Sequence, residues 1–380
     1  MDFGWSEKQL AFRHRARSAI RELLPADWYD VAVPKSYAHD DNVEFSRVFC
    51  SRLAELGLLV HHWPVEHGGA AGTDWEQFIL AEEMKAVGEP RAGQYMNVNW
   101  IGPTLMKFGT AAQKDAYLSG IAAGSSVWCQ GFSEPGAGTD LASLLTSAKE
   151  AEGGSYLING SKIWTSYARK ADFCFLAVRT GSSRKEISIF LVPMSLPGIT
   201  VRGIPGLVKD GHLNEVFFTN VHVDGAALLG ELHRGWDVIQ YALQLERVGV
   251  PRYHVGLKIL DSVMADLKAI GRADDKNIRA RAGMIASKLE AARLLTYLVV
   301  DQRVKREPPS ADANIARVST VEAVIDLLDF ILEFVPDALT GERPELEEYI
   351  RMSIPSGITA GTYELQLDLI ASGALGLERK

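Results

Sequence analysis

The chain has 380 residues, enough for two or three domains with a large core. Its residues are 47% hydrophobic and 23% charged, as in ordinary globular proteins, and the net charge of −8 argues against a nucleic-acid-binding surface. No stretch reaches about 18 apolar residues, and the N-terminus lacks a basic segment followed by an apolar one, so we predict neither a membrane span nor a secretion signal.

Residues 1–125 are predicted to form a helical domain. Helices are expected at 5–24, 43–57, 75–87, 99–108 and 110–122. Ser6 is a suitable N-cap for the first helix and Pro25 ends it, while Gly57 is a typical helix-ending glycine. The glycine-rich loop at 64–75 lacks the Gly-Lys-Ser/Thr ending of a phosphate loop, so a nucleotide role for it is not favoured.

Residues 126–234 change to a β pattern. Short runs rich in β-branched and aromatic residues, bounded by turn residues, occur at 155–160, 173–180, 187–193 and 214–223. No helical run separates them, so the sheet is expected to be antiparallel. No GxGxxG motif opens a strand–helix unit, which disfavours a Rossmann-type nicotinamide site.

Residues 235–380 are predicted to form a C-terminal helical bundle. Helices are expected at 235–269, 276–304, 311–335 and 345–374. Pro251 should bend the first of them, because it removes a backbone hydrogen bond. The sequence therefore predicts a mostly α protein with a central antiparallel β-domain, in the order α–β–α.

The three cysteines, Cys50, Cys129 and Cys174, are far apart, and no CxxC pair is present. This spacing predicts neither a zinc site nor a disulfide framework. We expect no metal site and interpret the cysteines as buried thiols of a cytoplasmic protein.

Two segments form a candidate ligand site, SVWCQGFSEPGAGTDLASL at 126–144 and INGSKIWTS at 158–166. Gly136 and Gly138 allow a backbone to approach a ligand closely, because they have no Cβ, and exposed amides beside them can meet polar or anionic atoms. Trp164 offers a flat indole face next to two hydroxyl residues. Each segment alone is also consistent with a surface turn, or with a strand that carries a core tryptophan.

Together the two segments resemble the signature of the acyl-CoA dehydrogenase family. The similarity continues along the chain in MDFGWSEKQLAFRHRAR, LGLLVHHWPVEHGGAAGTDWEQFILAEEM, GPTLMKFGTAAQKDAYLSGIAAGS and LNEVFFTNVHVDGAALLG, and it weakens after about residue 270. The resemblance implies the family's α–β–α fold, bound FAD, and removal of hydrogen from the α and β carbons of a coenzyme A thioester. In this family a carboxylate takes the α proton, while the β hydrogen leaves as hydride to flavin N5.

The resemblance also assigns residues to the site. Six are expected at the flavin ring: Gln130, Phe132, Ser133, Trp164, Thr165 and Ser166. Trp164 should lie against the ring and Ser166 should hydrogen-bond near N5, whereas Gln130 occupies a position that is often aromatic in the family. Thr139 corresponds to a small hydroxyl residue that contacts the coenzyme A arm, and Arg247 is assigned to the substrate.

The family places its catalytic carboxylate at one of two positions. The C-terminal one, in a Glu-Gly-Thr motif, corresponds here to Ala360, so that carboxylate is missing. The other lies on the first helix after the β-domain and corresponds to Glu246, within LQLERVGV at 243–250. We predict Glu246 as the base, with Glu364 as the alternative, one helical turn after Ala360. A glutamate that makes only an ordinary solvent-facing ion pair is the non-catalytic interpretation.

The chain departs from the family where homotetramers bind the ADP half of FAD. The Arg-x-x-Phe-Gly motif is replaced by AIGRADDKNIRAR at 269–281, and the Gln-x-x-Gly-Gly motif by DFILEFVPDAL at 329–339. We therefore expect a homologous partner subunit to complete the site, as in the heteromeric α2β2 acyl-CoA dehydrogenases of actinobacterial steroid catabolism. The stretches LERV at 245–248 and DGHLNEVFFTNV at 210–221 resemble the catalytic chains of that group.

The predicted function is FAD-dependent dehydrogenation of a bulky acyl-CoA, such as a steroid-derived one, with electron-transfer flavoprotein as acceptor. Small residues on the presumed site helix, Gly249 and Gly256, are the residue-level reason for a bulky acyl group. Two alternatives stay open at this stage. One is a non-catalytic structural partner subunit of a heteromeric enzyme. The other is an oxidase or monooxygenase on the same fold.

Overall fold

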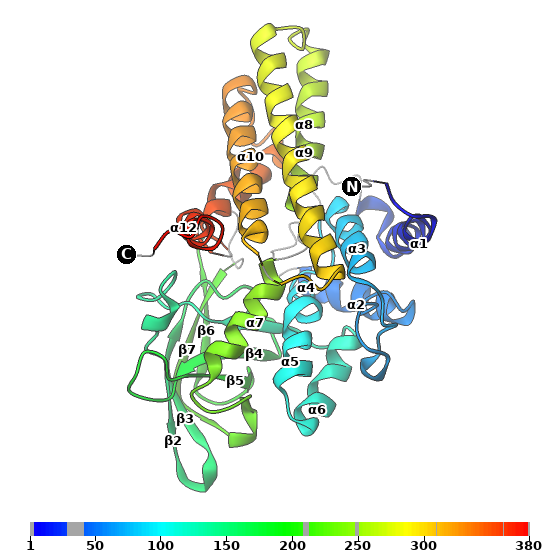
Figure 1. Cartoon of the computed structure of the whole chain (residues 1–380). Helices are drawn as coiled ribbons and strands as arrows, with labels where there is room; N and C mark the ends of the chain where they lie inside the picture. The colour runs from blue at the N-terminus through cyan, green and yellow to red at the C-terminus, as the bar shows by residue number, and fades with distance from the viewer. Residues whose placement is uncertain are drawn as a thin grey trace.

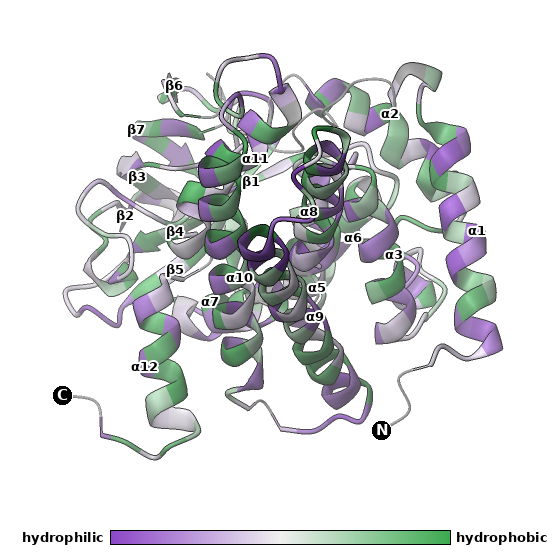
Figure 2. Cartoon of the chain, turned by 90° about the horizontal axis from the view of Figure 1, so that it is seen from above, coloured by the Kyte–Doolittle hydropathy of each residue, from purple (hydrophilic) through white to green (hydrophobic). Residues whose placement is uncertain are grey.

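The computed structural model of the chain describes residues 4–28, 42–207, 213–247, 251–308, 310–359 and 361–378. Figure 1 shows the N-terminal helices beside the sheet, with the long C-terminal helices rising above both. Seen from above in Figure 2, the long C-terminal helices at 252–334 lie between the sheet on one side and the first N-terminal helices on the other. The predicted α–β–α order is confirmed.

The N-terminal helices begin and end close to the predicted residues. They are α1 (Glu7–Leu23), α2 (Asn42–Glu55), α3 (Asp74–Ala86), α4 (Gln94–Met96), a π-helical turn (Asn97–Ile101), α5 (Gly102–Phe108) and α6 (Ala111–Ala122). Local chemistry explains the starts, because Ser6, Thr73 and Thr110 each form a capping box with the residue three positions later. The predicted helix at 99–108 is part of a longer helical run that starts at α4.

The sheet has eight strands in the described residues. They are β1 (Trp128–Gly131), β2 (Ser147–Glu150), β3 (Tyr156–Lys162), β4 (Phe173–Arg179), β5 (Ile187–Pro193), β6 (Ile199–Ile204), β7 (Leu213–Val223) and β8 (Leu228–Leu229). Their order is β6-β7-β3-β2-β4-β5-β8, with β1 also paired to β4. The prediction of an antiparallel sheet holds for most pairs but is wrong for two, because β1 and β2 both run parallel to β4.

The C-terminal part contains α7 (Gly235–Arg247), α8 (Arg252–Ala269), α9 (Lys276–Val304), α10 (Asp312–Phe334), α11 (Pro344–Ser353) and α12 (Tyr363–Gly373). The single helix predicted at 235–269 is broken rather than bent, because Pro251 has a ψ of 62°, which lies outside the helical range. The helix predicted at 345–374 is also broken. A short 3-10 turn at Ile354–Gly357 and a left-handed Gly361 separate α11 from α12.

Three large apolar clusters hold the parts together. One joins the N-terminal helices to a face of the sheet and to α7 through residues such as Ile101, Phe175 and Val238. The second fills the C-terminal bundle and includes Phe78 of α3, and the third lies within the β region around residues such as Val216. Among the described residues, no helix is long and apolar enough to cross a membrane, and no cluster of His, Cys, Asp or Glu is arranged to hold a metal ion.

Candidate active site

The two motif segments are joined by direct hydrogen bonds. The segment after β1 contains Phe132 and Ser133, and the segment at the end of β3 contains Lys162 and Ile163. The Ile163 amide donates to the Ser133 carbonyl at 2.9 Å, and the Lys162 ammonium donates to the Phe132 carbonyl at 3.0 Å. Two stretches about 30 residues apart in sequence therefore form one continuous surface.

A buried ion pair lies beneath this surface. Lys162 is fully buried, and its Nζ lies 2.7 Å from Oε1 of Glu134. The Glu134 carboxylate also accepts the amides of Leu145 at 2.6 Å and Thr146 at 2.9 Å. Burial lowers the pKa of Lys162, and the Glu134 charge opposes that shift. Burial raises the pKa of Glu134, but the Lys162 ammonium and the hydrogen bonds outweigh it, so this pKa is lowered.

The sequence analysis missed both members of this pair. One signal was available, because Lys162 ends a strand whose other inward position is apolar Ile158, and a lysine on a buried strand face needs an anionic partner. The partner's identity depends on the loop at 132–146, which the sequence alone does not position against β3.

Trp164 projects from a constrained backbone. Its φ is +60°, a left-handed conformation that is uncommon for a bulky residue, and 56% of its surface is exposed. The next residue, Thr165, is held on both sides by buried Asn214, whose carbonyl accepts the Thr165 amide at 3.0 Å and whose Nδ2 donates to the Thr165 carbonyl at 3.0 Å. The exposed indole thus lies next to a residue whose backbone is held by two hydrogen bonds.

The remaining residues assigned to the flavin differ in burial and in their contacts. Thr165 is buried and its hydroxyl has no hydrogen-bond partner among the described residues, while Ser166 is half-buried. Phe132 is buried against Phe175, with ring centroids 5.8 Å apart. The Gln130 side-chain oxygen accepts the Trp100 indole N–H at 3.0 Å, which ties β1 to the helical wall beside it.

The glycine-rich loop of the first motif is open to solvent. Thr139 is exposed, and a Cβ placed on Gly136 or Gly138 would meet no atom within 4 Å. These two glycines are therefore not required by close packing within this chain.

Glu246 lies on α7 and is half-buried. Its neighbours Leu243 and Leu245 pack against the large apolar cluster that joins the N-terminal helices, the sheet and α7. Burial raises the pKa of Tyr95, and the negative charges of Glu89 and Glu246 add to this shift while Arg91 and Arg252 oppose it. The Glu246 carboxylate is therefore close enough to the helical wall around Tyr95 to influence it electrostatically.

That wall includes a second buried ion pair that the sequence analysis missed. Arg91 donates from Nε to Glu89 at 2.6 Å, both side chains are buried, and the Arg91 guanidinium lies 5.3 Å from the centre of the Tyr95 ring. Glu89 adopts a left-handed φ of +60°, which the pair helps to hold. Tyr95 in turn packs edge-on against Trp100 at 5.4 Å.

The alternative base, Glu364, has a different environment. It is exposed in the first turn of α12, which begins at Tyr363 because the Thr362 side chain accepts the Leu365 amide at 3.2 Å. The helix therefore starts only one residue before Glu364. Ala360 itself, Gly249 and the side chain of Arg247 lie outside the described residues.

Two arginines of the altered C-terminal segment are engaged within this chain. Arg281 pairs with Glu333 and lies over the rings of Phe330 and Phe334. Arg272 donates to the Phe334 carbonyl at 3.5 Å and lies over the same ring. Both guanidinium groups are thus directed toward α10.

Gly256 does not leave room for a ligand. A Cβ at this position would lie 2.7 Å from Cδ2 of Leu289, so the glycine allows α8 to pack closely on α9. The prediction that Gly256 widens the site is therefore corrected.

Three family models match consecutive parts of the chain. They are the acyl-CoA dehydrogenase N-terminal domain at residues 6–125, the middle domain at 129–221 and the C-terminal domain at 233–375. The chain is also similar to the acyl-CoA dehydrogenase IpdE1 of Mycolicibacterium smegmatis, with 33% identity over 355 residues that cover 89% of each protein.

Two solved structures share the whole fold. The steroid ACAD Tcur3481–Tcur3483 aligns with a TM-score of 0.89 and 30% identity over 100% of both chains. The ChsE4–ChsE5 complex from Mycobacterium tuberculosis aligns with a TM-score of 0.86 and 28% identity, again over 100% of both chains.

Proposed function

The chain belongs to the acyl-CoA dehydrogenase family, and we propose that it uses FAD and the Glu246 carboxylate to dehydrogenate a bulky acyl-CoA. The predicted family, fold and enzyme class, an oxidoreductase acting on CH–CH bonds, are confirmed by these similarities. The observation that carries the proposal is the joining of the two motif segments at Ser133 and Ile163 next to an exposed Trp164.

The residues of this surface fit a flavin ring. Trp164 offers an exposed aromatic face, and the buried Thr165 hydroxyl has no partner among the described residues, so it can serve a ligand atom. The residues that would hold the ring are Gln130, Phe132, Ser133, Trp164, Thr165 and Ser166. Bound FAD would supply the acceptor for the hydride and electron pair that leave the substrate. Thr139, exposed in the glycine loop, and Arg247 remain our proposals for substrate contacts.

Glu246 is proposed as the base that removes the α proton. A carboxylate must be partly desolvated to act on so weak an acid, and Glu246 meets this condition because it is half-buried beside Leu243 and Leu245. Exposed Glu364 does not meet it.

The test of this assignment is Glu246→Gln, with Glu364→Gln as the matched control. We expect Glu246→Gln to retain flavin and to lose at least about 100-fold in kcat, the contribution typical of a general base. Glu364→Gln should be indistinguishable from wild type. The reverse pattern, with activity lost only in Glu364→Gln, would refute the choice of base and leave the dehydrogenase reaction intact.

We propose that a homologous partner subunit completes the FAD site. Arg272 and Arg281 are already engaged with α10, and the motifs that bind the ADP half in family homotetramers are absent. ChsE4–ChsE5 is a complex of two different chains, which favours the same arrangement here. The chain purified alone should be colourless, and the co-expressed pair should be yellow with two FAD per α2β2 tetramer. One FAD per subunit in a homotetramer would refute the partner.

The proposed substrate is a steroid-derived or similarly bulky acyl-CoA, supported by the similarity to the steroid ACAD Tcur3481–Tcur3483. The proposed electron acceptor is electron-transfer flavoprotein. Turnover with steroid-derived CoA thioesters should exceed turnover with straight medium-chain ones, without oxygen consumption. Oxygen consumption during turnover would instead indicate an oxidase or monooxygenase, and a preference for straight chains would refute the bulky substrate.

A further inference from the structure

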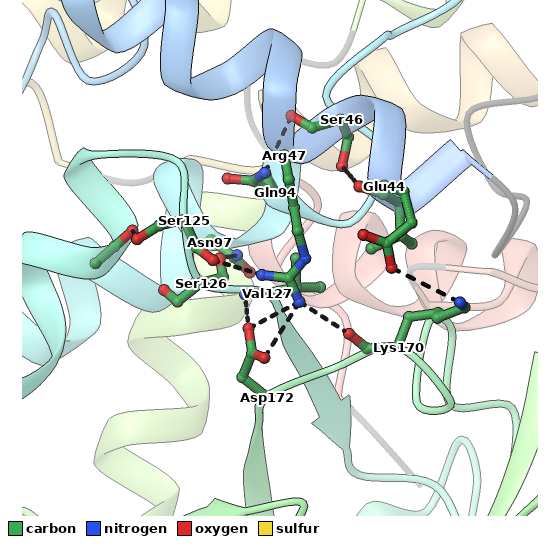
Figure 3. Close-up of polar contacts among 12 residues, drawn as sticks. Glu44, Ser46, Arg47, Gln94, Asn97, Ser125, Ser126, Val127, Lys170 and Asp172 are labelled. Carbon is green, nitrogen blue, oxygen red and sulfur yellow. Dashed lines mark hydrogen bonds and ion pairs between the residues drawn. The ribbon is translucent and has the colours of Figure 1, made fainter.

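Arg47 of α2 occupies the junction between the N-terminal helices and the β region. Its guanidinium donates to the Ser125 carbonyl and, at 3.2 Å, to the Lys170 carbonyl. It also pairs with the Asp172 carboxylate, with Nη2 3.0 Å from Oδ2. Figure 3 shows these acceptors converging on one side chain from segments that are far apart in sequence. The junction is reinforced by Asn97, which donates to the Ser126 carbonyl at 2.9 Å.

The segment that contains Ser125 leads directly into β1. Asp172 precedes β4 and Val127 precedes β1, and three hydrogen bonds join the two strand starts. The Val127 amide donates to Asp172 Oδ2 at 2.7 Å, and the Asp172 and Phe173 amides donate to the Val127 carbonyl at 2.7 and 3.3 Å. These bonds set the start of the parallel β1–β4 pair, in which Trp128 lies opposite Phe173. The position of Phe132, at the far end of the short strand, follows from that start.

The other two Arg47 partners, Lys170 and Asp172, lie at the end of the loop that carries Trp164. Tyr167 is buried with Val43, Ala92 and Val127, in a left-handed conformation with a φ of +64°. A Cβ on Gly93 would lie 2.9 Å from its ring, so α4 begins directly against this tyrosine. The Lys170 amide donates to the Tyr167 carbonyl at 2.9 Å, and the Lys170 carbonyl is an Arg47 acceptor. Arg47 therefore contacts the residue just before one motif segment and two residues that follow the other by a few positions.

We propose that Arg47 is a positioning residue for the flavin site, fixing β1 and the loop at 163–172 relative to each other. This inference rests on the proposed function, because it assigns the two segments to one cofactor surface. A planar guanidinium can serve two carbonyls and a carboxylate at once, whereas a lysine ammonium offers a single point of charge. This positioning role predicts that loss of Arg47 weakens flavin binding separately from any change in the global stability of the protein.

The test compares Arg47→Met with Arg52→Met in the full chain, co-expressed with its partner if wild type needs one to retain flavin. Arg52 lies on the same helix and pairs only at the surface with Glu55 at 3.2 Å, so it is a matched control. We expect Arg47→Met to weaken flavin retention about tenfold, the loss of roughly one charge-assisted hydrogen bond. It should also alter the flavin absorbance band and accelerate amide exchange at 126–133 and 163–172. Arg52→Met should change none of these.

Wild-type flavin affinity, spectrum and exchange in Arg47→Met would overturn the inference, and so would a uniform rise in exchange across the whole chain with an unaltered spectrum. If Arg47→Met does not fold, Asp172→Asn provides the same test, because it keeps an acceptor for the Val127 amide and removes the charge that faces Arg47. A wild-type protein that never retains flavin, with or without a partner, would refute the proposed function itself. Flavin that is bound equally well by wild type and variant would refute only the role of Arg47.

Discussion

Replacement of Lys162 by methionine is expected to destabilise the protein, because it leaves a buried carboxylate without its cation. Removing one member of a buried ion pair costs about 3–5 kcal/mol. Glu134 keeps the amides of Leu145 and Thr146 at 2.6 and 2.9 Å, which offset part of this cost. We therefore expect a loss of about 2–3 kcal/mol in the free energy of unfolding at neutral pH.

The pH dependence of this loss identifies its cause. In wild type the pKa of Glu134 is lowered, so its stabilising contribution is present above the ordinary pKa and disappears as the pH falls through the lowered value. In Lys162→Met the cation is gone and burial dominates, which raises the pKa of Glu134. The variant then gains stability relative to wild type as the pH falls and the carboxylate is protonated. The difference between the two proteins should shrink from pH 7 to about pH 4.5.

Urea unfolding at both pH values measures the difference, with Lys149→Met as the control. Lys149 is exposed on neighbouring β2, so its replacement should have little effect at either pH. The double variant Lys162→Met with Glu134→Gln should recover a large part of the loss at pH 7, because no buried charge remains. A loss that is equal at both pH values, and unchanged in the double variant, would refute the reasoning and point to lost packing of the lysine stem.

Three further predictions concern side chains with clearly different environments. Trp164→Ala should leave thermal unfolding nearly unchanged, because the indole is 56% exposed, while flavin retention measured by absorbance falls by about tenfold or more. Asn214→Ala should lower the melting temperature at a cost of about 1–3 kcal/mol, because the Thr165 carbonyl loses its Nδ2 donor, while the Thr165 amide keeps the backbone carbonyl of residue 214. Tyr253→Phe should cost about 1 kcal/mol in urea unfolding, since Glu82 loses a hydrogen bond of 2.5 Å but keeps those from Tyr297 and Arg13.

The parts of the fold that the sequence predicts well are those with local causes. The start of α1 follows from Ser6 and Gln9, which are three residues apart, and the end of α2 follows from Gly57, which has a φ of +67°. The parallel β1–β4 pairing has no such local cause. It depends on Asp172 bonding to Val127, 45 residues earlier, and on Arg47 from a third segment. Short β1 has too few residues to show a period, so it was not predicted as a strand.

The same distinction between local and long-range causes applies to the candidate site. The motif residues were identified by family resemblance, and the structure shows a physical basis for grouping them, namely the contacts of Lys162 and Ile163 with Phe132 and Ser133. Those contacts depend on a buried charge pair across 28 residues, which periodicity does not reveal. The exposure of Trp164 depends on a left-handed backbone, and sequence propensity argues against that conformation for a tryptophan.

The environments of the two candidate bases differ in a way that bears on the chemistry. Glu364 lies in the first turn of α12, where the helix dipole and solvent both stabilise a negative charge. Glu246 lies near the opposite end of its helix, since α7 cannot continue past Pro251, and the dipole there disfavours an anion. Partial burial beside Leu243 and Leu245 acts in the same direction. A base that acts on a weakly acidic carbon must be shielded from water, so partial burial favours Glu246 over exposed Glu364.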